Sequence, residues 1–428
     1  MSDAPDTPVV TVFLRHRGDV LLLRRSEDVG SYPGQWGAVA GHVQQDNPRA
    51  SALAEIEEET GLTERDVSMV REGPSFPVTD EEQGTRWVVH PFLFDAHTRE
   101  VDTNWETANV AWAAPTTLLR RDTVPDLWRS YRRVAPSIVE ITEDTTHGSA
   151  YLSLRALEVL RDRAGLLATT DAPDIENARA RLVDTAQRLL DARPSMAALA
   201  NRLHRVMHES FPEPTAAAVE TNAHEAIGRA LDTDAETARR AADQIAGNSV
   251  LTLSRSGTVL DALRRADPAP SVIVATSQPG GEGIGVAETL TDAGLDVTLI
   301  PDAAVATTLT SGAIDAVLVG ADTVRPTGAV VNKVGTRSAA LAAAHEQVPF
   351  YAACAVDKVS VEKEASATET ADPRTVYDGP APLEIAAPRF DETPPDLVTG
   401  GIITERGRHA SDDISSLAEE LQHLREWG

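Results

Sequence analysis

The stretch GADTVRPTGAVVNKVGT, residues 320–336, decides the fold of the C-terminal half of this 428-residue chain. It continues the apolar run DAVLV, so Asp322 lies just past the carboxyl end of a predicted strand, where ligands bind in open α/β sheets. Lys333 follows Asn332 at the predicted start of a helix, and a helix N-terminus with an ammonium group suits a phosphate. The alternative is that Asp322 caps a turn and Lys333 is a surface charge. Lysine occurs at only three positions in the chain, and this scarcity favours ligand binding.

Short apolar runs recur around this stretch and are separated by helix-length segments. This alternation predicts βαβ units and a parallel sheet from residue 249 onward. The preceding residues 149–246 are rich in Ala, Leu and Arg at helical spacing, and predict helices broken near 171–173, Pro194 and 212–214. The apolar runs are SVLTL, SVIVAT, DVTLIP, DAVLVG and PFYAACAV.

The N-terminal third has a different pattern. Strand-like runs at 9–14 and 20–23 flank a hairpin turn at 17–19. Residues 86–94 predict a further strand, and residues 118–134 predict a helix. This part therefore mixes strands and helices without the regular βαβ alternation of the C-terminal part.

One predicted helix of this third carries a run of acids. Asn47 suits the N-cap, Pro48 follows it, and Gly61 ends the helix. The carboxylates of Glu55, Glu58 and Glu59 then share one face, where like charges weaken a helix by a few tenths of a kcal/mol per pair. A divalent cation would reverse this repulsion, because Mg²⁺ prefers oxygen ligands. The alternative is a solvated acidic face.

The whole chain is acidic, which supports that alternative. Asp and Glu number 66 against 39 Lys and Arg, and the net charge is −27. This balance predicts a halophilic protein, because salt screens self-repulsion, and it disfavours nonspecific nucleic-acid binding. The single cysteine, Cys354, excludes an internal disulfide and a Cys-based zinc site, and we expect an inert core thiol. No apolar run has membrane-spanning length and no signal core is present, so we expect a cytoplasmic protein without membrane contact.

The acidic helix and the loop before it resemble those of the Nudix hydrolases, over roughly residues 7–130. The resemblance implies Mg²⁺ or Mn²⁺ bound by Glu55, Glu58 and Glu59, with Glu58 and Glu59 also catalytic, and hydrolysis of a nucleoside-diphosphate derivative. Ala54 stands where the family has an orienting arginine, and loss of such a group costs about ten- to a hundredfold in affinity or activity. Asp46 is the nearest match to the upstream acid, and the loop is one residue short. The matching residues are Gly41, His42, Val43, Glu55, Ile56, Glu58, Glu59, Gly61 and Leu62.

The C-terminal part resembles a second family, from about residue 137 to the end. This superfamily comprises the alpha, beta and delta subunits of translation initiation factor 2B, methylthioribose-1-phosphate isomerase and archaeal ribose-1,5-bisphosphate isomerase. The motifs that carry the resemblance are THGS (146–149), LTLSRS, TSQP, DAAV, the stretch quoted first, and FDETPPDLVTGGIITERG.

In the isomerases of that superfamily, a cysteine and an aspartate shuttle protons. Asp322 matches the aspartate, whereas Ser254 matches the cysteine and is a far weaker acid. Ser254 with Arg255, and Gln278 with Pro279, resemble instead the regulatory subunits, which implies ligand binding without turnover. The resemblance implies that Gly148, Arg255, Asn332 and Lys333 bind the sugar phosphate or nucleotide.

We therefore expect an α/β protein with three parts: a Nudix-like α/β/α sandwich (1–134), a helical subdomain (137–246) and a Rossmann-like parallel-sheet domain (247–428). The first functional hypothesis is a Nudix hydrolase fused to a sugar-phosphate-binding domain, in nucleotide or pentose-phosphate metabolism. The second is a non-catalytic regulatory protein that resembles initiation factor 2B. The third is an aldose–ketose isomerase that uses Asp322 with Ser254. The expected ligands are nucleoside-diphosphate-type or sugar-phosphate small molecules, and the family fold implies a homodimer or higher homo-oligomer.

Overall fold

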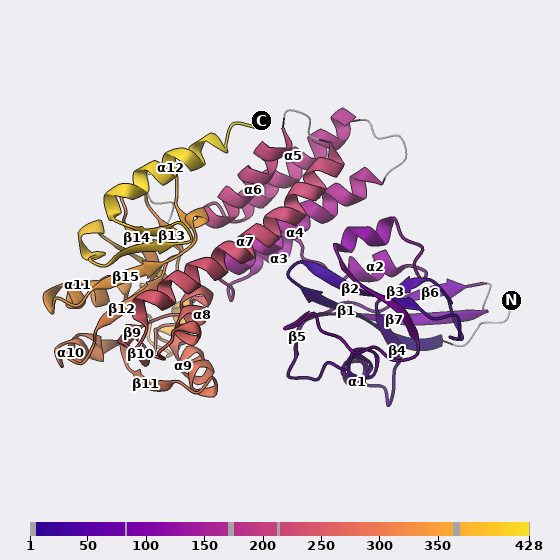
Figure 1. Ribbon diagram of the computed structural model, residues 1–428, viewed down its shortest axis with the longest axis horizontal. Coiled ribbons are helices and arrows are strands. Elements are labelled where there is room, and N and C mark those ends of the chain that lie inside the picture. Colours follow the sequence, from indigo (N-terminus) through magenta and orange to yellow (C-terminus); the bar gives the residue numbers. More distant parts are fainter. Residues whose placement is uncertain (1–5, 82–83, 170–174, 212–214, 363–368, 428) are drawn as a thin grey trace. The chain divides into compact units, whose positions relative to one another are not determined.

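The computed structural model describes residues 6–81, 84–169, 175–211, 215–362 and 369–427 (Figure 1). Contacts divide the chain into two compact units. Unit 1 comprises residues 1–138, 157–185 and 214–228, and unit 2 comprises 139–156, 186–213 and 229–428. No helix in these described ranges is both long and apolar enough to cross a membrane.

Unit 1 contains the mixed sheet of the N-terminal third. In its described residues, eight strands form one sheet, in which β1 pairs in parallel with β7 and antiparallel with β2 and β4. The strands are β1 (Asp6–His16), β2 (Asp19–Arg25), β3 (Trp36–Gly37), β4 (Val39–His42), β5 (Val67–Glu72), β6 (Phe76–Asp80), β7 (Thr85–Ala96) and β8 (Thr107–Ala113). The helical elements are α1 (Pro48–Thr60), η1 (Pro115–Leu119) and α2 (Leu127–Tyr131).

Alternate residues of β1 point to opposite faces of this sheet, as the two-residue period of a strand requires. Val12 packs in the same buried cluster as Ile56 of α1, whereas Phe13 packs with Leu127 of α2. The sheet is thus covered by helices on both faces. The expected α/β/α sandwich is confirmed.

Local sequence determines α1 as expected. The Asn47 side chain accepts a hydrogen bond from the backbone N–H of Ala50, and Gly61 ends the helix at φ 71°. The hairpin turn at 17–19 also forms, with Arg17 at φ 53° and Gly18 at φ 84°. The helix expected at 118–134 is wrong in part: only 115–119 and 127–131 are helical, because Thr123 bridges to Trp36 between them.

In sequence order, α3 (Ile138–Glu143) and four long helices follow the strands of unit 1 and precede those of unit 2. The long helices are α4 (Ser149–Ala168), α5 (Ile175–Ala192), α6 (Ala197–Ser210) and α7 (Ala216–Ile245). The break at Pro194 separates α5 from α6, as predicted. The breaks predicted near 171–173 and 212–214 fall at least in part outside the described residues. Helices α4, α5 and α7 each contribute residues to both units.

Unit 2 contains the predicted parallel sheet. Its described strand order is β11-β10-β9-β12-β15-β17-β18, parallel except for β18, and β13, β14 and β16 form a small antiparallel sheet. The strands are β9 (Ser249–Thr252), β10 (Ser271–Ala275), β11 (Asp296–Ile300), β12 (Ala316–Gly320), β13 (Thr323–Val324), β14 (Val330–Lys333), β15 (Phe350–Ala353), β16 (Phe390–Thr393), β17 (Gly401–Thr404) and β18 (Gly407–His409). The helical elements are α8 (Gly257–Arg265), α9 (Glu282–Asp292), η2 (Asp302–Ala304), α10 (Val305–Leu309), α11 (Thr336–His345), η3 (Val356–Lys358), η4 (Pro373–Thr375), η5 (Pro395–Leu397), η6 (Ser411–Asp413) and α12 (Ile414–His423).

Both faces of this parallel sheet are buried, which explains why its strands read as continuous apolar runs. Val317 of β12 packs in one cluster with residues of α10, α11 and α12, and Leu318 packs on the other face with residues of α7, α8 and α9. The expected Rossmann-like arrangement is confirmed.

Gly283 of α9 is required where this helix approaches the sheet. A Cβ atom at Gly283 would lie 1.9 Å from the backbone oxygen of Ala275 in β10, whereas one at Gly285 would meet nothing within 4 Å. We expect Gly283→Ala to lower the melting temperature, because either α9 or the end of β10 must move. Gly285→Ala is the matched control and should leave stability unchanged or raise it by up to about 1 kcal/mol, through helix propensity. Equal melting temperatures for the two variants in thermal denaturation would contradict this close approach.

Candidate functional site

A cavity of about 210 Å³ lies in unit 2, at the carboxyl ends of the parallel strands. Five of the residues predicted from sequence line it: Gly148, Ser254, Arg255, Asp322 and Lys333. They come from the residue before α4, from the segments after β9 and β12, and from β14, so segments far apart in the chain meet here. Many other lining side chains are charged: Asp144, Arg193, Glu282, Arg325, Glu369, Arg389, Asp391 and Glu392.

Asp322 is recessed at the end of β12. Burial raises the pKa of its carboxyl group above the ordinary value, although Lys358, Arg389 and Lys333 oppose that shift. The backbone N–H of Asp322 donates to the Val331 carbonyl oxygen at 2.9 Å, which fixes the residue against β14. A carboxyl group with a raised pKa stays protonated to higher pH and suits a proton donor.

Ser254 lies opposite a second serine, at the ends of adjacent strands. Ser254 and Ser277 have φ angles of 67° and 65°, in the left-handed region that costs non-glycine residues of order 1–3 kcal/mol. The Ser254 N–H donates to Ser277 Oγ at 2.6 Å. Asp302, in the DAAV motif, accepts from the N–H groups of Ser277 and Gln278 at 2.7 and 2.8 Å. Hydrogen bonds therefore connect the three segments that follow β9, β10 and β11.

The N-terminus of α4 provides a site for an anion. The first N–H groups of a helix have no partners within the helix and favour a phosphate. Ser149, the first residue of α4, is 3 % exposed, and its hydroxyl has no hydrogen-bond partner among the described residues. Arg255 Nη2 donates to the Thr146 carbonyl oxygen at 2.6 Å, and Arg193 donates to the carbonyl oxygens of Ile141 and Asp144. Two guanidinium groups are thus held beside this helix terminus.

The expectations for Lys333 and Asn332 need correction. Lys333 does not begin a helix; it ends β14, and its Nζ donates to Glu282 Oε1 at 2.7 Å. Asn332 does not line the cavity and donates from Nδ2 to Thr336 Oγ1 at 3.0 Å. The N-terminus of α11 already has an anion, because Asp391 Oδ2 accepts from the Gly335 N–H at 2.7 Å. The predicted phosphate cradle at α11 is therefore filled by the protein itself.

Cys354 lies at the end of β15 and is fully buried. Burial raises the pKa of its thiol to about 12, so the thiol stays neutral at physiological pH. Cys354 does not line the cavity. Its surroundings are those of a core residue.

The carboxylates of α1 form a separate acidic group in unit 1. Glu59 is 6 % exposed, and burial raises its pKa to about 8, with smaller contributions from Glu55 and Glu106. Burial also raises the pKa of Glu55, and the charges of Glu58 and Glu106 raise it further. Glu106 is thus a fourth carboxylate near the helix, and it was not among the predicted site residues.

The expected metal-chelating trio is not formed. Carboxylate oxygens are chemically suited to Mg²⁺ or Mn²⁺. However, Glu58 is exposed, whereas Glu59 is buried with Oε1 accepting from the Ala40 N–H at 3.2 Å. Across the residues that the structure describes, no three His, Cys, Asp or Glu side chains are grouped to hold a metal ion.

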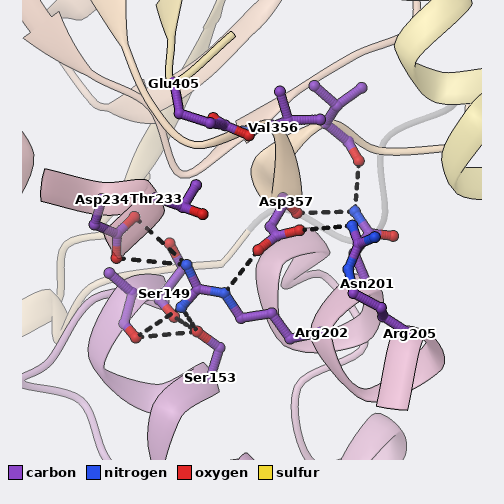
Figure 2. Close-up of polar contacts among 12 residues, drawn as sticks. Ser149, Ser153, Asn201, Arg202, Arg205, Thr233, Asp234, Val356, Asp357 and Glu405 are labelled. Carbon is purple, nitrogen blue, oxygen red and sulfur yellow. Dashed lines mark hydrogen bonds and ion pairs between the residues drawn. The ribbon is translucent and has the colours of Figure 1, made fainter. Parts of the chain in front are cut away.

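A buried arginine, Arg202, joins segments that also contribute to the cavity, and Figure 2 shows its polar contacts. Arg202 of α6 donates to Asp357 Oδ2 at 3.1 Å, to Ser153 Oγ at 2.8 Å, and to both Asp234 oxygens at 3.4 Å. These partners belong to the turn after β15, to α4 and to α7. Next to it, Asn201 Nδ2 donates to the carbonyl oxygens of Asp357 and Val359 at 2.8 and 2.7 Å.

The same turn carries Lys358 toward the cavity. Lys358 Nζ donates to the Ala321 carbonyl oxygen at 2.6 Å, directly before Asp322. Arg202 therefore links two parts of the fold. One is the first turns of α4, through Ser153, and the other is the turn of Asp357 and Lys358, which contacts the residue before Asp322.

Comparison with known proteins defines the class of each part. The NUDIX domain model matches residues 5–134. The remainder is similar to ribose 1,5-bisphosphate isomerase of Haloferax volcanii, with 30% identity over 310 residues that cover 68% of this chain and 94% of that protein. It is also similar to methylthioribose-1-phosphate isomerase of Exiguobacterium sibiricum, with 29% identity over 58% of this chain and 79% of that protein. The chain is thus related in sequence to two sugar-phosphate isomerases.

The model of the initiation factor 2 subunit family matches residues 145–411, and the chain belongs to this family. Among solved structures, translation initiation factor eIF-2B of Pyrococcus horikoshii OT3 is similar, with a TM-score of 0.54 and 26% identity over 64% of this chain and 95% of that chain. The 5-methylthioribose 1-phosphate isomerase of the same organism shares the fold, with a TM-score of 0.54 and 20% identity over 74% of this chain and 90% of that chain.

Removal of the Arg202 guanidinium should destabilise unit 2. Arg202→Met removes the shared partner of two partly buried carboxylates, while Asp357 keeps its ion pair with Arg205. We expect the free energy of unfolding to fall by about 1–3 kcal/mol, because a polar group loses its partner in a largely desolvated place. Arg264→Met, at an exposed position of α8, is the control and should change stability by less than about 0.5 kcal/mol. Denaturant unfolding in high salt measures both. A loss of less than about 1 kcal/mol in the free energy of unfolding of Arg202→Met would show that these contacts of Arg202 do not stabilise unit 2.

Proposed function

We propose that unit 2 isomerises a ribose-type sugar with a phosphate ester at C1, converting an aldose phosphate into the ketose phosphate. The relatives named above act on ribose 1,5-bisphosphate and on methylthioribose 1-phosphate, which share this C1 phosphate. The observation that carries the proposal is that Asp322, the N-terminus of α4 and several cationic side chains line one cavity.

In this proposal, the C1 phosphate binds at the N-terminus of α4. The N–H groups after Gly148 and the hydroxyl of Ser149 would donate hydrogen bonds to its oxygens, and Arg193 and Arg255 would balance its charge. Asp322 then acts as the general acid, which donates a proton to the ring oxygen as the sugar ring opens. This role uses the raised pKa of the buried carboxyl group.

Asp322→Asn should lower kcat for isomerisation by about 10²–10⁴-fold, because the variant cannot donate the proton. Conversion of ribose 1,5-bisphosphate and related C1 phosphates is followed by NMR in molar KCl, since the acidic composition predicts a need for salt. Asp296→Asn, at the exposed amino end of β11, is the matched control and should retain the wild-type rate.

The pH profile provides a further check on the role of Asp322. The reaction needs the protonated form of Asp322, so the rate should fall as pH rises through its raised pKa. If the wild-type protein binds these sugars but converts none of them, the proposal is wrong and the regulatory-subunit hypothesis replaces it. Ligand-induced thermal stabilisation measures that binding.

A second candidate function concerns unit 1. The NUDIX match, with Glu106 close to Glu55 and Glu59, favours hydrolysis of a nucleoside-diphosphate derivative that depends on Mg²⁺ or Mn²⁺. Binding of the cation would require the exposed Glu58 to join Glu55 and Glu59.

Nucleotide release from ADP-ribose, dinucleoside polyphosphates and nucleoside-diphosphate sugars tests this candidate. We expect release with either cation, and a loss of at least tenfold in Glu58→Gln. Glu57→Gln, at the adjacent exposed position of α1, is the control and should retain activity. Equal turnover in all three proteins, or none in any, would remove the candidate.

Two further expectations stay proposals. We propose that the chain divides functionally at residues 1–134, 137–246 and 247–428. We also propose a homo-oligomer, because the family resemblance implies one. Sedimentation of the full chain in high salt tests the second proposal.

A further inference from the structure

Isomerisation of an aldose phosphate through an enol moves protons at two places, and two groups in one cavity can carry them. One donates to the ring oxygen, and the other removes the proton from C2 and returns one to C1. Asp322 supplies the first in the function proposed above, on which this inference rests. Ser254, at the second position, has a hydroxyl that is too weak an acid and base to act without an adjacent base. A further group in the cavity is therefore needed.

Glu282, the first residue of α9, has the geometry for this second role. It lines the same cavity as Asp322 and Ser254. Its Oε1 accepts from Lys333 Nζ at 2.7 Å, while its Oε2 is buried and has no hydrogen-bond partner among the described residues. A buried carboxylate oxygen without a partner costs free energy, so its retention calls for an explanation. A substrate C–H bond, which donates no ordinary hydrogen bond, would leave that oxygen available as a base.

The neighbouring glycine leaves room for this carboxylate. A Cβ atom at Gly280 would lie 2.4 Å from Glu282 Oε1 and 2.6 Å from Oε2. The carboxylate thus folds back over Gly280 and is held there by Lys333. Any larger residue at position 280 would displace it.

We propose that Glu282 is the second proton carrier, acting as the base at C2 and the acid at C1. Asp322 donates its proton to the ring oxygen as the bond from C1 to that oxygen breaks. Glu282 removes the C2 proton, and the electron pair of that bond forms the C1–C2 double bond of an enol. Glu282 returns its proton to C1, while the proton on O2 passes to Asp322 and the C2 carbonyl forms. Both side chains end as they began, and the phosphate ester is unchanged.

Glu282→Gln tests the proposal with little change of shape. We expect kcat for isomerisation to fall by about 10²–10⁴-fold. Thermal stabilisation by the sugar phosphate should be retained, because the proposed phosphate site uses the N-terminus of α4 with Arg193 and Arg255. Exchange of the C2 hydrogen with deuterated solvent should disappear, which a purely structural role of Glu282 would not cause. The loss in Ser254→Ala should be smaller than in Glu282→Gln.

Two glycine variants separate the position of the carboxylate from its chemistry. Gly280→Ala should lower kcat by displacing Glu282, whereas Gly285→Ala, with open space around it, should retain the wild-type rate. If the wild-type protein isomerises and depends on Asp322, but Glu282→Gln keeps kcat within threefold, this inference alone is overturned. If no C1 phosphate is converted by the wild-type protein, the proposed function fails and the inference falls with it.

Discussion

The buried guanidinium of Arg202 is the interaction on which the geometry of unit 2 depends. A charge that is 2 % exposed is tolerated only when it is fully paired, and Arg202 pairs with Asp357 and Asp234. Its planar group has donors in several directions, so one side chain joins three helices and the turn after β15. A lysine could not reach the same partners at once. The walls of the cavity are therefore positioned by a residue that does not line it.

Cationic groups in the cavity are balanced individually, each by a neighbouring carboxylate or carbonyl group. The protein carries a net charge of −27, yet the cavity gathers arginines beside the first turn of α4. Lys333 is neutralised by Glu282, and the terminus of α11 is neutralised by Asp391. The α4 terminus is different, because Ser149 keeps an unused hydroxyl there. An incoming dianion would therefore find an unused donor at α4, whereas Lys333 and the terminus of α11 are already paired within the protein.

Sequence reasoning succeeded where structure is determined locally. The bounds of α1 follow from Asn47 and Gly61, and the place of Asp322 follows from the end of an apolar run. It failed where partners are distant in the chain. Lys333 belongs to a strand because β14 pairs with β16, whose Phe390 lies opposite it. The roles of Arg202 and Glu282 were not predictable, because an arginine or glutamate in an acidic, arginine-rich chain carries no distinguishing signal.

The scarcity of lysine has a chemical consequence for a protein that handles sugars. The ketose phosphate formed in the proposed reaction has a ketone at C2, and primary amines condense with carbonyls to form Schiff bases. Lys333 and Lys358 are 4 % and 6 % exposed, so the described surface offers a ketose no exposed lysine amine. Guanidinium groups keep their protons and are far poorer nucleophiles. Reliance on arginine for surface cations would thus protect a protein with the proposed function from slow glycation by its own product.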